Sequence, residues 1–234
     1  MKFGVAQIAL DSDVNLNLEK IRHYVAEAAR AKADILCFPE CSLTGYRRDF
    51  GEINWAEVTK ALDVLQEVAR EKDIAVIVGT PYLETARVYN AALVMSTGRL
   101  RYFKNNLTDF DEQYFAQGQD ILTFEFRGVR CGVLICRDQN YPLLAQEYAR
   151  VGTRVIFLLA AHYYLPSEAR LKLEKNRALP IARAVENKLF VAKANAVGSQ
   201  GDCVSLGHSM IVNPDGLVIC EAGEKQEELL CHEL

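Results

Sequence analysis

The sequence lacks the features that would direct it to nucleic acid or to a membrane. Its 234 residues contain no block of lysines and arginines, and 27 basic against 31 acidic residues give a net charge of -4. Such a chain has no positive field to hold a phosphate backbone. No segment approaches the roughly 18 consecutive apolar residues of a membrane span. The apolar N-terminal stretch also reaches Asp11 too early for a signal peptide. We therefore expect neither nucleic acid nor a membrane as a partner.

Paired cysteines are also missing. The seven cysteines are an odd number and none forms a C-x-x-C pair. Most lie in apolar stretches, where a free cysteine behaves as a small buried hydrophobe. Cys37 and Cys41 have no second ligand pair at a suitable spacing, and the four histidines are scattered, so we expect no metal site. A reduced, cytoplasmic setting is the simplest interpretation.

No linker, composition break or repeat divides the chain, which predicts one domain over residues 1–234. Helical spacing of apolar residues predicts helices near 15–32, 55–72 and 142–151, and a longer one ending near residue 188. Pro180 should kink or split that last helix. Apolar runs predict strands between the helices, and the middle of the chain has only extended segments joined by turns. This pattern indicates an α/β layered sandwich of mixed sheets with helices outside.

Three of the predicted strands end at a reactive side chain. Glu40 follows the strand "DILCF", Lys104 follows "RYF", and Cys136 follows "CGVLI". Taken singly, each has an ordinary explanation as a solvated turn residue, a surface lysine or a packing cysteine. Together, a base, a cation and a thiol are the groups that nucleophilic acyl transfer needs.

The segments around these residues resemble the nitrilase superfamily of carbon-nitrogen hydrolases. "FPECSLTGY" (38–46) is similar to that family's glutamate motif, "YFKNNLTDFDEQYFAQG" (102–118) to its lysine motif and "GVLICRDQNYP" (132–142) to its cysteine motif, in the family's order. Three ordered motifs are more specific than any single short pattern. The resemblance implies a four-layer α-β-β-α sandwich, no cofactor, and a homodimer or small homo-oligomer that packs helices against helices.

The resemblance also implies catalytic roles. Glu40 would be the general base, Lys104 the cation that stabilises the transition state and Cys136 the nucleophile. Glu112 matches a second acidic position that helps to place the lysine and the substrate. Tyr46, at the end of the glutamate motif, is expected to contact substrate.

Two segments depart from the family pattern. Arg137 follows the nucleophile where an aromatic residue is common. Its guanidinium either faces the pocket and pairs with a substrate carboxylate, or turns away to pair with Asp138 or another acid. In "LLAAHYYLP", His162 and Tyr163 are expected to line the acyl pocket, with core or interface packing as the alternative for the tyrosines.

The function predicted from these residues is hydrolysis of a non-peptide C–N bond, in a linear amide or an N-carbamoyl (ureido) compound, through a cysteine thioester. Four alternatives stay open. They are a nitrilase, a glutaminase-type ammonia supplier, an acyltransferase, and an inactive family member that serves as an interaction module.

Overall fold

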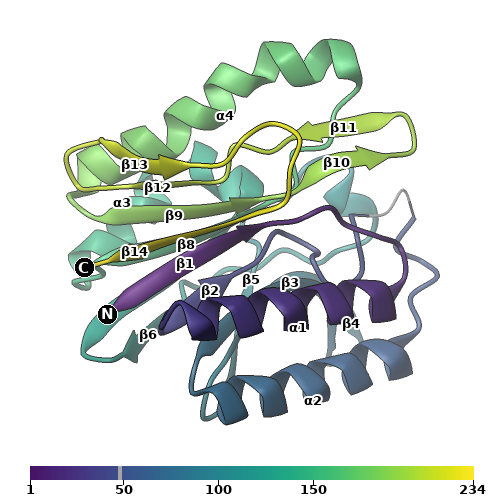
Figure 1. The fold of residues 1–234 in the computed structure, drawn as a ribbon. Coiled ribbons are helices and arrows are strands. Elements are labelled where there is room, and N and C mark those ends of the chain that lie inside the picture. Colours follow the sequence, from purple (N-terminus) through teal and green to yellow (C-terminus); the bar gives the residue numbers. More distant parts are fainter. Residues whose placement is uncertain (47–48) are drawn as a thin grey trace.

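Two six-stranded β-sheets form the centre of the molecule (Figure 1). The computed structural model describes residues 1–46 and 49–234. The first sheet contains, in spatial order, β14 (Glu228–Glu233), β1 (Lys2–Gln7), β2 (Ile35–Cys37), β3 (Ala75–Glu84), β4 (Arg87–Met95) and β5 (Arg99–Phe103). The second contains β13 (Val218–Glu221), β12 (Met210–Val212), β9 (Phe190–Asn195), β8 (Val155–Ala160), β7 (Val129–Ile135) and β6 (Thr123–Phe126). A separate hairpin joins β10 (Val197–Gln200) to β11 (Cys203–Leu206).

Both sheets are mixed, as the sequence pattern indicated. The triples β1-β2-β3 and β7-β8-β9 are parallel, and the outer strands pair antiparallel to them. Parallel strands need crossover connections, and helices supply these. Hairpins instead add β4 and β5 to the first sheet and β6 and β13 to the second, which is why the middle of the chain has no helical periodicity.

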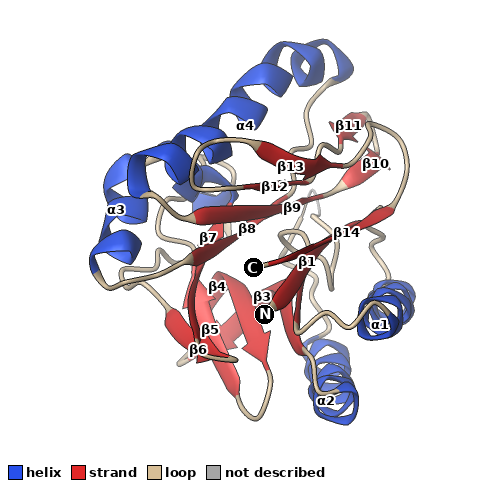
Figure 2. Ribbon diagram, turned by 60° about the vertical axis from the view of Figure 1, so that its left-hand side comes forward, coloured by secondary structure: helices blue, strands red, loops and turns tan. Residues whose placement is uncertain are grey.

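The helices cover the outer faces of the two sheets, so the layers run helix, sheet, sheet, helix (Figure 2). Helices α1 (Val14–Arg30) and α2 (Trp55–Lys72) bury an apolar face against the first sheet. Helices α3 (Pro142–Arg150) and α4 (Pro166–Asn187) do so against the second. A third apolar core, which includes Phe3, Ile77 and Phe157, fills the space between the sheets. The predicted four-layer sandwich is confirmed.

Capping residues determine where helices α1 and α2 begin and where α2 ends. The Asp13 carboxylate accepts hydrogen bonds from the first backbone N–H groups of α1, and Asn54 caps α2 in the same way. Helix α2 ends where Asp73 adopts a left-handed conformation. The predicted span 55–72 for α2 is therefore matched at both ends.

Helix α4 runs as one helix of 22 residues with Pro180 inside it, so the expected split of this helix is wrong. Proline has no N–H for the carbonyl four residues earlier, which here belongs to Asn176. That carbonyl instead accepts a hydrogen bond from the Lys193 ammonium at 3.2 Å, which reaches it from β9. A donor from the neighbouring sheet thus replaces the bond that proline removes.

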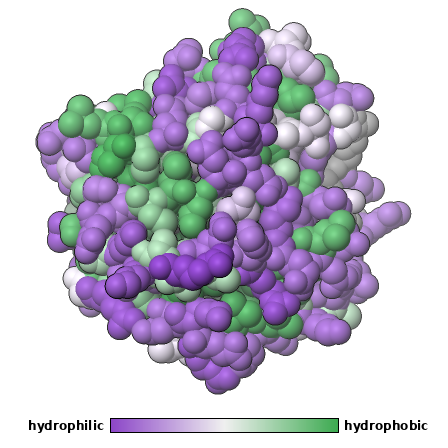
Figure 3. All heavy atoms as spheres, in the orientation of Figure 1, coloured by the Kyte–Doolittle hydropathy of each residue, from purple (hydrophilic) through white to green (hydrophobic). Residues whose placement is uncertain are grey.

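The surface carries apolar side chains on the α3 and α4 side of the molecule. Leu143 on α3 and Leu171 on α4 are 71% and 82% exposed. Figure 3 shows a further apolar area at its left, over the β12–β13 hairpin. The homodimer stays a prediction, for which these helices offer apolar contact area. Among the described residues, no helix is long and apolar enough to cross a bilayer.

Gly79 on β3 determines how closely that strand approaches the loop after β2. A Cβ atom at this position would lie 2.4 Å from the Cys41 nitrogen and 2.7 Å from the Glu40 Cα. Both contacts are with backbone, which cannot move aside as a flexible side chain can. Only glycine therefore allows the loop that carries Glu40 to pack on β3.

We expect Gly79→Ala to lower the free energy of unfolding by about 1 to 3 kcal/mol, the usual cost of overpacking a core, and to displace Glu40. Thermal unfolding measures the effect. Gly98→Ala is the matched control, because a Cβ at Gly98 meets nothing within 4 Å. Equal melting temperatures for the two variants would contradict this account.

Candidate active site

A buried ion cluster lies where β2 and β5 end. The Lys104 ammonium is 2.6 Å from Glu40 Oε1 and 2.8 Å from Asp111 Oδ2, and all three side chains are 0% exposed. Burial of isolated charges is costly unless they are paired and hydrogen-bonded, as these are. One ammonium faces two carboxylates, so the cluster has an excess of negative charge.

Cys136 stands beside this cluster at the end of β7. The chain turns directly from the strand into the short 3₁₀ helix η2 (Cys136–Asn140), and Cys136 takes the left-handed φ of 46°. A non-glycine residue held in that region marks a backbone that the surrounding structure constrains. At this turn Cys136 packs against the core between the sheets and also lines a cavity.

The electrostatics of the three groups depend on one another. Burial raises the pKa of the Cys136 thiol, the Glu40 carboxylate raises it further, and Lys104 opposes both. Burial also raises the pKa of Glu40 above its ordinary 4.5, against the lowering influence of Lys104. Burial alone would lower the pKa of Lys104, but Glu40, Cys136 and Asp111 together raise it well above its usual value. Lys104 is therefore a permanent cation next to a protonated thiol and a basic carboxylate.

Two further residues, whose roles here were not predicted from the sequence, fix this geometry. Asn90 on β4 donates to Glu40 Oε1 at 2.8 Å, while Oε2 accepts no hydrogen bond within the described structure. The Asp138 carboxylate accepts from Tyr102 Oη, from the Ile135 backbone N–H and from both nitrogens of Asn106. Asp138 thus ties η2 to β5 and to the loop after Lys104. Its position two residues after the cysteine, in "CRD", was the available signal.

A cavity of about 990 Å³ opens in front of Cys136. Its wall is largely aromatic and apolar, and includes Tyr46, Phe110, Tyr163 and Tyr164, with Asp11 and the β10–β11 hairpin at other parts of the lining. Glu40 and Lys104 lie behind the cysteine and are shielded from solvent. Only the thiol of the catalytic candidates lines the cavity.

The structure brings together Glu40, Lys104 and Cys136, but not Glu112. The Glu112 side chain is exposed, and its neighbour Asp111 makes the contact with Lys104. The expectation that Glu112 places the lysine is therefore wrong. The 3₁₀ turn η1 (Asp111–Gln113) directs Asp111 inward, where Oδ2 also accepts the Thr108 backbone N–H. Sequence alone could not tell which of two adjacent acids faces inward.

The predicted substrate-binding residues divide into two groups. Tyr46, His162 and Tyr163 line the cavity, and Tyr46 Oη donates to Asp111 at 3.1 Å. Arg137 is half-buried, and its side chain is not among the described residues that line the cavity. Asp138, its proposed alternative partner, is already fully engaged. The structure thus contradicts Arg137 as a residue of the cavity wall.

Known proteins resemble this chain in architecture and in sequence. The (R)-stereoselective amidase of Pseudomonas sp is 32% identical over 237 residues, which cover 97% of this chain and 82% of that protein. The 2-oxoglutaramate amidase of Bacillus subtilis is 29% identical and covers 97% of this chain and 88% of its own length. An amidase from Nesterenkonia AN1, solved as a cysteine-to-alanine mutant, superposes with a TM-score of 0.90 at 25% identity, over all of this chain and 90% of that one.

These matches and the fold define an α-β-β-α sandwich hydrolase of the nitrilase superfamily, amidase-like branch. The family model for carbon-nitrogen hydrolases matches residues 2–234, and the chain belongs to that family. It is an amidase-type hydrolase of C–N bonds.

Replacing Asp111 by Asn should lower amide hydrolysis by about a hundredfold, because a small displacement of a catalytic group has that effect. The neutral side chain no longer attracts the Lys104 ammonium, which can then shift. Glu112→Gln is the matched control, since it removes the same charge from the adjacent, exposed position, and it should retain wild-type rates. Steady-state ammonia release measures both, and equal losses would contradict the role of Asp111.

Proposed function

We propose that this chain hydrolyses a linear amide or an N-carbamoyl compound through a thioester on Cys136. The observation that supports this most directly is the thiol facing the cavity with the buried Glu40–Lys104 pair behind it. A related amidase has been solved in complex with butyramide, a simple linear amide. The same amidase shows Michael addition of acrylamide at its active-site cysteine in a second structure.

The first half of the reaction forms the thioester. Glu40 takes the proton of the Cys136 thiol as the sulfur attacks the amide carbonyl carbon. The negative charge that develops on the carbonyl oxygen is stabilised by the Lys104 ammonium and by the backbone N–H of Arg137. Glu40 then returns its proton to the nitrogen, the C–N bond breaks, and ammonia or an amine leaves.

The second half releases the acid. A water molecule attacks the thioester carbonyl while Glu40 accepts its proton. The C–S bond breaks, the acid departs, and the proton returns from Glu40 to the sulfur. Lys104 stays charged throughout, because its raised pKa keeps its proton in place. Asp111 acts by holding that ammonium in position.

A glutaminase-type role is the second candidate. The glutamine-dependent NAD(+) synthetase of Aquifex aeolicus is 32% identical over 93% of this chain, which spans 39% of that longer protein. Glutamine therefore belongs in the substrate panel beside simple amides and ureido acids. Ammonia release from glutamine above that from simple amides would favour this role.

Cys136→Ala should reduce hydrolysis by at least about a thousandfold, as loss of a nucleophile does in comparable enzymes. Cys203→Ser is the matched control, because Cys203 is a second thiol in the lining of the same cavity. Wild-type enzyme mixed briefly with substrate should gain the mass of the acyl group, and hydroxylamine should trap it as a hydroxamate. Full activity in Cys136→Ala would refute the thioester route.

The acid limb of the pH–activity profile should have its midpoint above pH 4.5. Glu40 must be ionised to accept the thiol proton, and burial raises its pKa above that ordinary value, so protonation inactivates the base as the pH drops through the raised pKa. Asn90→Ala should shift this limb to still higher pH, since the Asn90 hydrogen bond lowers the pKa of Glu40. The profile of kcat/KM against pH measures both, and a limb at or below 4.5 would contradict Glu40 as the base.

A further inference from the structure

Tyr46 is a residue of the cavity wall whose hydroxyl reaches the buried ion cluster. Its side chain lines the same cavity as Cys136. Its hydroxyl donates to Asp111 Oδ1 at 3.1 Å, and Asp111 Oδ2 accepts from the Lys104 ammonium at 2.8 Å. Lys104 in turn lies 2.6 Å from Glu40 Oε1. Two hydrogen bonds thus connect the surface of the cavity to the cation of the active site.

The two oxygens of the Asp111 carboxylate have different partners. Oδ2 accepts from the Lys104 ammonium and from the Thr108 backbone N–H at 2.9 Å, whereas Oδ1 accepts from the Tyr46 hydroxyl. The terminal torsion of an aspartate side chain has a broad energy well, so bonds at both oxygens are needed to fix the plane of the carboxylate. Loss of the Tyr46 bond therefore frees that plane, and with it the oxygen that holds Lys104.

The protonation states of this pair suit a strong hydrogen bond. Burial raises the pKa of Tyr46 well above its ordinary value, and the charge of Glu40 raises it further. Burial would raise the pKa of Asp111 as well, but Lys104 and Thr108 lower it overall. The stable pair is therefore a neutral hydroxyl that donates to an ionised carboxylate, and such charge-assisted bonds are about twice as strong as neutral ones.

The Tyr46 ring belongs to a group of aromatic rings at the cavity. The ring centroids of Phe50 and Phe110 each lie 5.8 Å from that of Tyr46. Phe110 also lines the cavity, and it directly precedes Asp111 in the chain. An acyl group that packs on this part of the wall therefore contacts both the residue that binds Asp111 and the residue next to Asp111.

We propose that Tyr46 couples recognition of the acyl group to catalysis. It is a positioning residue that fixes Lys104 through Asp111, and its ring makes that position respond to the acyl group. The proposal rests on the proposed amide hydrolysis at Cys136. Contacts with a remote part of a substrate accelerate the chemical step when they improve the placement of a catalytic group. An acyl chain long enough to reach the ring should therefore be turned over faster than a short one.

Tyr46→Phe removes the hydroxyl and keeps the ring in the wall. It should lower kcat and kcat/KM for butyramide by about ten- to a hundredfold, the usual effect of one hydrogen bond to a charged group, with KM near its wild-type value. Tyr24→Phe is the matched control, because the Tyr24 hydroxyl also donates to a carboxylate, that of Glu227 at 3.4 Å, outside the cavity wall. It should keep wild-type kcat and KM. A raised KM with unchanged kcat in Tyr46→Phe would overturn the proposal.

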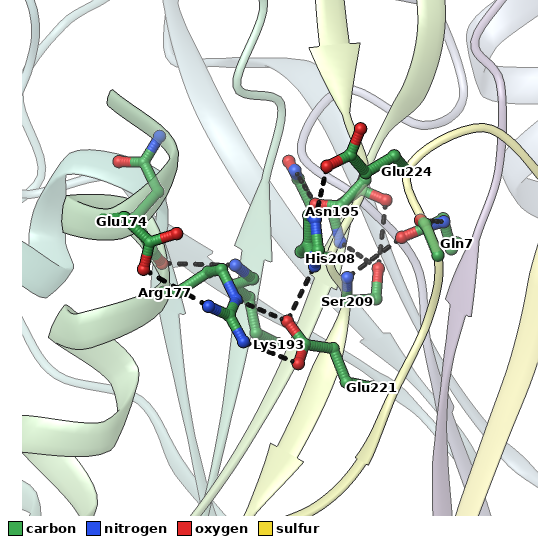
Figure 4. A network of polar contacts seen from close by, with 12 residues as sticks. Gln7, Glu174, Arg177, Lys193, Asn195, His208, Ser209, Glu221 and Glu224 are labelled. Atoms are coloured by element: carbon green, nitrogen blue, oxygen red, sulfur yellow. Dashed lines mark hydrogen bonds and ion pairs between the residues drawn. The ribbon is translucent and has the colours of Figure 1, made fainter. Parts of the chain in front are cut away.

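A network of polar contacts away from the cavity provides the comparison for purely structural damage (Figure 4). Arg177 on α4 binds Glu221 on β13 with hydrogen bonds of 2.7 and 2.9 Å, and His208 Nδ1 is 2.7 Å from the same carboxylate. None of these three is among the described residues that line the cavity. Arg177→Gln should therefore lower the melting temperature and leave kcat and KM unchanged. An equal loss of kcat in Arg177→Gln and Tyr46→Phe would overturn the proposal.

A double variant tests the route through Asp111. Adding Tyr46→Phe to Asp111→Asn should cost little beyond the loss that Asp111→Asn causes alone, because the effects of residues that act as a unit are not additive. Losses that multiply would show that the Tyr46 hydroxyl acts on another group, and they would overturn the positioning role.

The response to the acyl group is measured as ammonia release from acetamide and from butyramide. Wild-type enzyme should show the higher kcat with butyramide, and Tyr46→Phe should turn over the two amides with similar kcat values. Equal kcat values in the wild-type enzyme, or a difference that survives in Tyr46→Phe, would overturn the coupling. Absence of hydrolysis and of any acyl-enzyme with both amides in the wild-type enzyme would instead overturn the proposed function.

Discussion

The site depends on one buried ammonium shared between two carboxylates. Lys104 would not stay charged in a dry interior without Glu40 and Asp111, and neither acid would stay ionised without Lys104. The arrangement resolves a conflict in the chemistry, because a base strong enough to deprotonate a buried thiol must not be neutralised by its own cation. Burial, together with the charge of Asp111, leaves Glu40 with a raised pKa while Lys104 keeps its proton.

The sandwich is what makes this cluster possible. The ends of β2, β5 and β7 come from both sheets, and they meet only because the sheets face one another with the apolar core between them. Glycine at position 79 lets the loop of Glu40 lie on β3, and Asn90 on β4 orients the carboxylate from the other side. Each contact joins residues far apart in the chain, so the site forms only when the sheets have assembled.

The sequence predicted the elements and the reactive residues well, because both are local signals. Apolar spacing gave α2 its bounds, and the strand ends at Glu40, Lys104 and Cys136 were readable from the run of residues before them. The errors arose where the contacts of a side chain in the folded structure decide the outcome. Pro180 stays within α4 because Lys193 on another element supplies the missing donor. Asp111 replaces Glu112 because a 3₁₀ turn sets which acid faces inward. Arg137 is not among the described residues that line the cavity, although it directly follows Cys136.

The Asp138 carboxylate gives the two parts of the site different freedom to change. It binds the cysteine turn, β5 and the lysine loop with four hydrogen bonds, so the reacting groups form one rigid unit. Of the wall, Tyr46 is bound to that unit through its hydrogen bond to Asp111, whereas Tyr163, Tyr164 and the β10–β11 hairpin lie outside it. Substitutions at these wall residues can therefore alter which acyl group fits without disturbing the chemistry. The cavity wall can vary while the catalytic groups stay the same.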